Sequence, residues 1–267
     1  MARQGEKGGL KNASLLAAAL IAAVLAWASA VRGQGAPVLS PVPKACETPG
    51  AQVIADSPLP NIVAALKERK KITILAIGST SASLRGPVSG GHYAIVERFL
   101  ETTFKGLDVQ IVHRGVSGEL AADAAERIKT EVALANADLV LWQMGTADAM
   151  AQVPVADFYA VVSETVAWLK QRKIDVILVG LRYARSMAKD LHYQAIRAAI
   201  QDIAKKQNVL RIGQYDAEET LEKLRHEQGV LMSDTEVTES NYVCMAEYLA
   251  RAIATGLFVR EHPPKQP

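Results

Sequence analysis

Five short apolar runs, rich in β-branched residues, alternate with longer segments of helical periodicity along this chain of 267 residues. The runs occupy residues 71–78, 108–115, 137–145, 175–181 and 209–215. They lack the strict apolar–polar alternation of a sheet with one wet face, so we expect both faces of each strand to be covered. The pattern predicts an α/β fold with three layers, α/β/α, around a parallel sheet of five strands.

The segments between the runs carry apolar residues at helical spacing, at about 91–105, 119–135, 157–172 and 187–207. One further helix is predicted before the first strand, at 60–70, and two more close the chain, at 216–228 and 240–257. Ligands of open α/β sheets bind at the carboxyl ends of the strands. Functional residues are therefore expected in the loops that follow Gly78, Gly115, Gly145 and Leu181.

The first 60 residues have a different character. Three basic residues precede an uncharged run at 13–31, and Ala28-Ser29-Ala30 has the small-x-small form of a signal-peptidase site. Residues 1–30 are predicted to be a signal peptide or, alternatively, an uncleaved membrane anchor, because the run approaches the length of a spanning helix. Both alternatives predict an exported protein, periplasmic or extracellular, and the anchor alternative would hold it at the inner membrane.

Domain boundaries follow from the same change in composition. Residues 31–59 are rich in proline and show no apolar periodicity, which predicts an extended linker. The remaining segment, 60–260, is long enough for one domain with a single core.

Composition excludes several classes of function. A formal net charge of +2 provides no basic field, so no nucleic-acid partner is expected, and contact with a membrane is expected only through residues 1–30. No metal or cofactor is expected, because the sequence has neither metal-ligand spacing nor a phosphate-cradling loop. In an oxidising compartment the pair Cys46 and Cys244 predicts a disulfide, with two unpaired thiols as the alternative.

Four segments at the strand ends carry the residues of chemical interest. The first run ends in GSTSAS (78–83), the second leads into RGVSGEL (114–120), and the third leads into MGTADAM (144–150). Late in the chain, LMSDTEVTESNYVCMAEYLA (231–250) feeds the final helix. The second segment brings backbone N–H groups to a helix N-terminus, an arrangement suited to an anion.

In this order, the four segments resemble the four sequence blocks of the SGNH/GDSL hydrolase family, over about residues 70–256. The resemblance implies a flavodoxin-like α/β/α sandwich and ancestry as a carboxylic-ester (acyl or O-acetyl) hydrolase. In that family, the first block carries a nucleophilic serine. The second and third blocks supply oxyanion donors, and the last supplies a histidine base with an aspartate that orients it. GSTSAS is similar to the first block of exported bacterial members.

Carried over residue by residue, the family pattern is only partly retained. The nucleophile position falls on Thr80, and Gly118 keeps the glycine of the second block. Ala147 replaces the oxyanion asparagine of the third block, whereas the aspartate that follows it is kept as Asp148. A threonine nucleophile normally uses an N-terminal amine as its base, and an internal Thr80 has none.

The last block lacks its histidine in either of two registers. Aligned through Tyr242 and Cys244, the histidine position falls on Glu236. In the other register Asp234 keeps the aspartate and Val237 takes the histidine position. An unperturbed glutamate has a pKa of about 4.3, against about 6.5 for histidine, so it is a poor base near neutral pH.

Other residues are candidates for the missing roles. Ser79 or Ser81 is an alternative nucleophile if the turn is shifted by one residue, and His113 or Asp234 is an alternative base. Arg182 and Tyr183 follow the fourth strand beside the expected cleft and are predicted to contact an anionic or sugar ligand. For these two the alternative is a solvated loop.

Two functional hypotheses remain open. In the first, the loss of the family's Ser, Asn and His makes this copy a catalytically impaired binding or scaffold protein. Its partner would be a cell-envelope carbohydrate or an acylated small molecule. In the second, the protein is an active ester hydrolase with a rearranged site that uses a hydroxyl of residues 79–81. Such a hydroxyl within hydrogen-bond reach of His113 or Glu236 would favour the second hypothesis.

Overall fold

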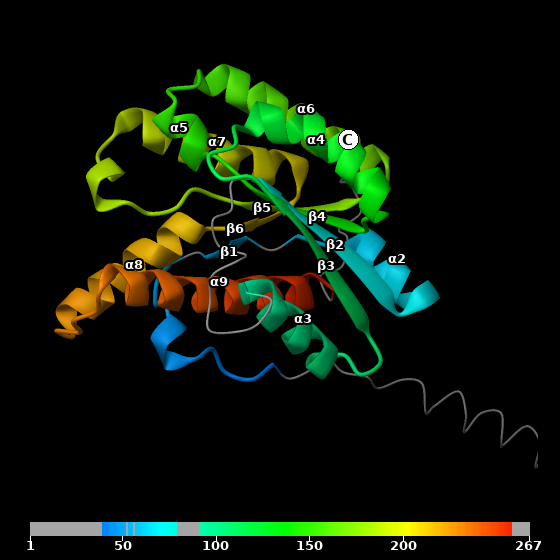
Figure 1. The fold of residues 1–267 in the computed structure, drawn as a ribbon, viewed down its shortest axis with the longest axis horizontal. Coiled ribbons are helices and arrows are strands. Elements are labelled where there is room, and N and C mark those ends of the chain that lie inside the picture. Colours follow the sequence, from blue (N-terminus) through cyan, green and yellow to red (C-terminus); the bar gives the residue numbers. More distant parts are fainter. Residues whose placement is uncertain (1–38, 52, 56, 79–90, 258–267) are drawn as a thin grey trace, which may run out of the picture. The chain divides into compact units, whose positions relative to one another are not determined.

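A computed structural model describes residues 39–51, 53–55, 57–78 and 91–257, and the account below concerns these residues. They form a six-stranded sheet in the order β1-β6-β5-β4-β2-β3 (Figure 1). The five strands β2 to β6 are parallel, and the two-residue edge strand β1 pairs antiparallel with β6. The predicted five-stranded parallel sheet is therefore confirmed, with one short antiparallel edge added.

The strands and helices alternate along the chain as predicted. The strands are β1 (Ile54–Ala55), β2 (Lys71–Gly78), β3 (Asp108–Gly115), β4 (Leu139–Gln143), β5 (Asp175–Val179) and β6 (Leu210–Ile212). One helical layer contains α4 (Ala121–Ala135), the short α5 (Thr146–Met150), α6 (Val155–Gln171) and α7 (Leu191–Gln207). The other side of the sheet carries α2 (Pro60–Arg69), α3 (Gly91–Thr103), α8 (Gln214–Glu227) and α9 (Asp234–Gly256). Two 3-10 turns complete the set, η1 (Lys44–Cys46) and η2 (Arg185–Met187).

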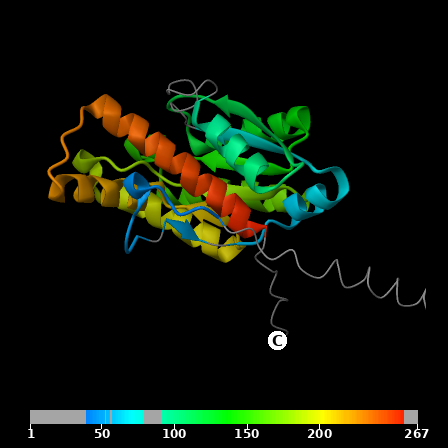
Figure 2. The same cartoon turned by 90° about the horizontal axis from the view of Figure 1, so that it is seen from below.

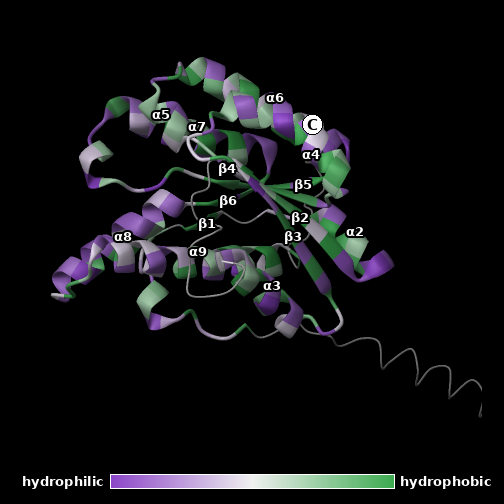
Figure 3. Ribbon diagram, viewed as in Figure 1, coloured by the Kyte–Doolittle hydropathy of each residue, from purple (hydrophilic) through white to green (hydrophobic). Residues whose placement is uncertain are grey.

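Each central strand contributes to a separate core on each face of the sheet. On β2, Leu75 and Ile77 pack with the core beneath α4, α6 and α7, whereas Ile74 and Ala76 belong to the core beneath α3 and α9. This double burial is the physical reason that the runs are continuously apolar. Figure 3 shows the same distribution, with hydrophobic colours on the central strands and hydrophilic colours over much of α8.

The segment before α2 is packed onto the domain from residue 39 onward. The predicted disulfide is present, and Cys46 and Cys244 join this segment to α9. Figure 2 shows the segment running beside that helix. Tyr248 on α9 donates a hydrogen bond to the Cys46 carbonyl, and the Arg251 guanidinium donates to the carbonyls of Ser40 and Pro41. The compact domain thus begins before residue 60, which corrects the predicted extent of the linker at 31–59.

Cys46, Val53 and Leu59 are buried in the core, and this burial explains why proline-rich sequence without periodicity is nevertheless fixed in place. The expected signal peptide or anchor at 1–30 lies outside the described residues. Among the residues that are described, no helix has the length and apolar composition needed to span a bilayer.

Candidate functional site

Gly78 ends β2, the neighbour of edge strand β3, at the carboxyl ends of the strands where function was expected. It lies in register with Gly115 on β3 and Gln143 on β4. Its φ is +107°, and a Cβ at this position would lie 2.0 Å from the Gln143 carbonyl oxygen. Only glycine fits this backbone and this close approach. The three candidate nucleophiles that follow it, Ser79, Thr80 and Ser81, lie outside the described residues.

Asp148 connects the loops that follow β3 and β4. Its carboxylate is 1 % exposed and accepts hydrogen bonds from the N–H groups of Ala121, at 2.9 Å, and Gly145, at 3.2 Å. Burial raises the pKa of Asp148, although both hydrogen bonds oppose that shift. Its position and partners give Asp148 a structural role, since it holds the starts of α4 and α5 together. Ala147 beside it carries no donor on its side chain.

Gly118 lies in an exposed turn between β3 and α4, with a φ of +74°. The turn is closed by a hydrogen bond from the N–H of Glu119 to the Val116 carbonyl, at 3.3 Å. The Glu119 carboxylate is buried and paired with Arg127 at 2.6 Å, which ties the turn to α4. The turn that contains Gly118 is therefore fixed to the start of α4, and its role as an oxyanion donor stays a prediction.

Glu236 occupies the first turn of α9 and is exposed. Its carboxylate accepts hydrogen bonds from both the N–H and the hydroxyl of Ser233, each at 2.8 Å, and the Ser233 hydroxyl accepts from the N–H of Glu236. This reciprocal pair is a capping box. The hydrogen bonds from Ser233 lower the pKa of Glu236, so the carboxylate is ionised and engaged at neutral pH. Asp234, in the same turn, is also exposed.

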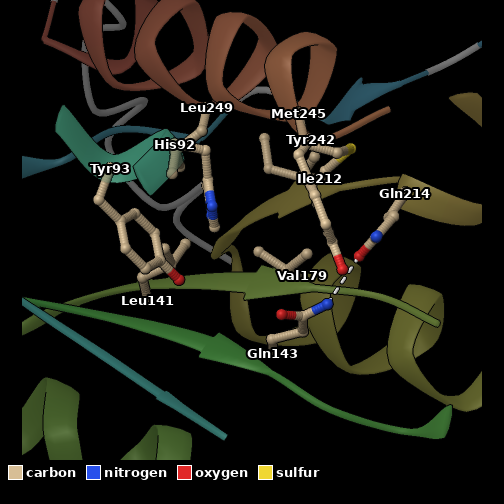
Figure 4. A pocket seen from close by; sticks show the side chains of 10 residues that line it. All are labelled: His92, Tyr93, Leu141, Gln143, Val179, Ile212, Gln214, Tyr242, Met245 and Leu249. Carbon is tan, nitrogen blue, oxygen red and sulfur yellow. Dashed lines mark hydrogen bonds between the residues drawn. The ribbon is translucent and has the colours of Figure 1, made fainter. Parts of the chain in front are cut away.

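A cavity of about 30 Å³ lies between the carboxyl ends of β4, β5 and β6 and the helices α3 and α9 (Figure 4). Such a volume holds about two water molecules. Five of the lining residues are apolar: Leu141, Val179, Ile212, Met245 and Leu249. The other five carry polar atoms: His92, Tyr93, Gln143, Gln214 and Tyr242. Neither Glu236 nor His113 is among the lining residues.

Aromatic rings from α3, β3 and α9 gather at one end of this cavity. The ring of Tyr93 lies 4.1 Å from that of His92 and 5.6 Å from that of His113, and the rings of His92 and Tyr242 are stacked at 5.8 Å. Burial, followed by the nearby charge of Arg114, lowers the pKa of His113, which favours its neutral form at pH 7. Burial raises the pKa of the Tyr93 phenol.

Arg182 and Tyr183, predicted to contact ligand, differ in their placement. The Arg182 guanidinium donates to the Tyr242 hydroxyl at 3.4 Å and lies 3.6 Å from the Glu218 carboxylate. It does not line the cavity, but it contacts the lining residue Tyr242. The ring of Tyr183 packs edge-on against Tyr215 and does not line the cavity.

Sequence reasoning missed a chain of polar groups that connects two lining residues, Gln143 and Gln214, to the buried Glu218. Gln143 Nε2 donates to Gln214 Oε1 at 2.9 Å, and Gln214 Nε2 donates to Glu218 Oε1 at 2.9 Å. Glu218 is 3 % exposed, and its other oxygen accepts from the Tyr183 N–H at 2.7 Å. His92 was also missed as a lining residue. The available signal was a glutamine, Gln143, at the end of an otherwise apolar strand. Elsewhere in the described chain, no group of three or more His, Cys, Asp or Glu residues is placed to hold a metal ion.

Comparison with known proteins places these features in a family. The sequence profile of the non-GDSL lipase-like family matches residues 45–258. No curated protein shows significant sequence similarity to the chain.

Solved structures share the fold at low sequence identity. An α/β hydrolase from the metagenome of Lake Arreo, Spain, is 17% identical, with a TM-score of 0.56, over 71% of this chain and 97% of that one. The acetylxylan esterase Axe2 of Geobacillus stearothermophilus is 20% identical, with a TM-score of 0.54, over 71% and 95%. A lipase/acylhydrolase of Enterococcus faecalis is 18% identical, with a TM-score of 0.55, over 69% and 95%. The family match and these folds confirm the resemblance to SGNH/GDSL hydrolases.

Proposed function

Since the chain belongs to the non-GDSL lipase-like family of SGNH/GDSL-type esterases, we propose that this copy has lost efficient ester hydrolysis and uses its cleft for binding. The observation that carries the proposal is the role of Glu236. In the register aligned through Tyr242 and Cys244, the family's histidine position falls on Glu236, an exposed carboxylate that caps a helix and whose pKa is lowered. In the other register it falls on Val237, which has no ionisable group. Neither residue is a base that deprotonates a hydroxyl near pH 7.

The other replacements act in the same direction. Loss of an oxyanion donor, as at Ala147, costs a factor of about 10² to 10³ in rate. Loss of the histidine of a catalytic triad costs a factor of about 10⁶, a figure that comes from subtilisin. The retained features, Gly78, Gly118 and Asp148, shape the strand-end loops, so their retention supports a preserved cleft rather than a preserved reaction.

The proposed location is outside the cytoplasm, with residues 1–30 as a signal peptide or membrane anchor. The disulfide between Cys46 and Cys244 supports this location, because disulfides persist in oxidising compartments. In that setting the proposed ligand is a cell-envelope carbohydrate or an acylated small molecule.

One observation favours the alternative, an active ester hydrolase with a rearranged site. His113 lies on β3 directly beside Ala76 of β2. Two residues after Ala76, β2 ends at Gly78, and the three candidate hydroxyls of residues 79–81 follow in the sequence. The lowered pKa of His113 keeps the imidazole neutral, as a general base requires.

Hydrolysis of p-nitrophenyl acetate and of an acetylated sugar distinguishes the two functions. The full chain, with its disulfide intact, is compared with Ser79→Ala, Thr80→Ala, Ser81→Ala and His113→Gln. The proposal predicts turnover at the buffer rate in every case, on protein shown to be folded by circular dichroism. The proposal is contradicted if the wild-type chain shows turnover that is abolished by one of the three hydroxyl substitutions and, separately, by His113→Gln. That result establishes the alternative.

A further inference from the structure

The cavity between β4, β5, β6, α3 and α9 has a polar wall formed by the side-chain amides of Gln143 and Gln214. A buried carboxylate outside the cavity sets which end of each amide donates and which accepts. The fixed point is Glu218, which is 3 % exposed. One of its oxygens accepts from the Tyr183 N–H and the other from Gln214 Nε2, and Arg182 lies 3.6 Å away. Burial raises the pKa of Glu218, and the Arg182 charge and these hydrogen bonds oppose that shift without reversing it. The direction of the bonds follows from the donors instead. A backbone N–H and a guanidinium only donate, so the Glu218 oxygens that face Tyr183 and Arg182 both act as acceptors.

This constraint passes along the two amides in turn. Gln214 presents its NH₂ group to Glu218, so its carbonyl oxygen faces Gln143. Gln143 then presents its own NH₂ group to that oxygen, at 2.9 Å. The Gln143 carbonyl oxygen is left on the side of Tyr93 and His92, toward the cavity (Figure 4). The chain of bonds therefore offers an acceptor to a ligand at this point.

The remaining features limit the ligand group to a small and neutral one. Arg182 beside the polar wall is paired with Glu218, so its charge is compensated rather than offered to an anion. The volume of about 30 Å³ admits roughly two or three non-hydrogen atoms. Val179, Ile212 and Met245 supply an apolar surface beside the Gln143 amide.

We propose that this cavity is a subsite for the hydroxymethyl group of a neutral alcohol or sugar. Its hydroxyl donates to Gln143 Oε1, and its methylene packs against the apolar side chains of β5, β6 and α9. The inference rests on the proposed function, in which the cleft binds a ligand. It adds that the group bound at Gln143 is a hydrogen-bond donor, because an ester carbonyl, which only accepts, cannot bond to Gln143 Oε1.

Two isomers of C₂H₆O test the direction of this hydrogen bond. Ethanol has a hydroxyl that donates, and dimethyl ether has the same atoms but only accepts. The ¹⁵N-labelled full chain is titrated with each isomer in a sealed tube. The readouts are the side-chain amide signals of Gln143 and Gln214, assigned with Gln143→Met and Gln214→Met, and Overhauser contacts to the Met245 methyl group. Three non-hydrogen atoms limit the Kd to about a millimolar at best.

Ethanol is expected to bind about fivefold more tightly than dimethyl ether, the ratio that one net hydrogen bond of about 1 kcal/mol provides. Gln143→Met should abolish this preference, and Glu218→Gln should weaken it, because a carboxamide no longer fixes the direction of the Gln214 amide. The backbone spectrum of each variant reports whether it is folded.

Equal or tighter binding of dimethyl ether overturns the inference, and so does the absence of saturable shifts with both isomers. Neither isomer carries an ester bond, so this result is independent of the hydrolysis assay. Ester turnover would contradict the proposed function and leave the preference measurable. Loss of the preference would remove the subsite and leave the proposed function intact.

Discussion

Replacement of Asp148 is predicted to destabilise the protein by disconnecting the loops after β3 and β4. In Asp148→Ala the N–H groups of Ala121 and Gly145 both lose their buried acceptor. An unsatisfied buried donor costs about 1–3 kcal/mol, so we expect a loss of about 3–4 kcal/mol in the free energy of unfolding. Asp148→Asn retains one acceptor oxygen, and we expect a loss of about 1–2 kcal/mol.

The effect of Asp148→Asn should also depend on pH. Burial raises the pKa of Asp148 in the folded state, so the folded chain holds this proton more tightly than the unfolded chain does. The linked stability is fully present below the unfolded pKa, about 3.9, and is lost as the pH rises through the folded pKa. The advantage of the wild-type chain over Asp148→Asn is therefore greatest near pH 4 and decreases toward pH 7.

Urea unfolding followed by circular dichroism between pH 4 and pH 8 measures both effects. Asp123→Asn is the matched control, because it removes an exposed carboxylate from the first turn of the same helix, α4. It should change the free energy of unfolding by less than about 0.5 kcal/mol. An Asp148→Ala variant as stable as this control, or a wild-type advantage that grows with pH, would refute the reasoning.

Three further predictions concern the disulfide, Gly78 and Glu236. Closing 198 residues of chain is worth about 5 kcal/mol by chain entropy, and comparison of the oxidised chain with a Cys46→Ser/Cys244→Ser variant in urea should give at least about 2 kcal/mol. Gly78→Ala should cost more than about 3 kcal/mol, because strain at positive φ is joined by a clash with strand β4. Gly50→Ala, where φ is +77° and the space around the Cβ is open, is its control and should cost only about 1–2 kcal/mol. Glu236→Ala should lower the Tm at pH 7. Since the pKa of Glu236 is lowered in the fold, the difference in Tm between wild type and variant should shrink below about pH 4. The rate of ester hydrolysis should be the same for the variant and the wild type at every pH.

The fold was predictable because its signals are local. β2 and β3 begin and end at the residues expected from their apolar runs. For β2 the reason is that both of its faces pack against helices. β4, β5 and β6 are shorter than their runs, because the apolar residues that follow them, such as Met144 and Leu181, are buried in the turns instead.

The cavity was not predictable from spacing. His92, Gln143, Gln214 and Tyr242 come from four different elements, and only the crossings of the sheet bring them together. Alignment to a family block assigned Glu236 to the position of a base. However, Ser233 three residues before it forms a capping-box signature that is readable in the sequence itself. Local helix chemistry was thus the better guide to that residue.

The central claim is that no hydroxyl of Ser79, Thr80 or Ser81 is activated as a nucleophile. The most direct test is to treat the full chain with a fluorophosphonate probe, beside an active serine esterase, and to measure the intact mass of both. The account predicts that the mass of this chain stays unchanged while the esterase is labelled completely. One stoichiometric adduct, mapped by peptide sequencing to residues 79–81, would contradict it.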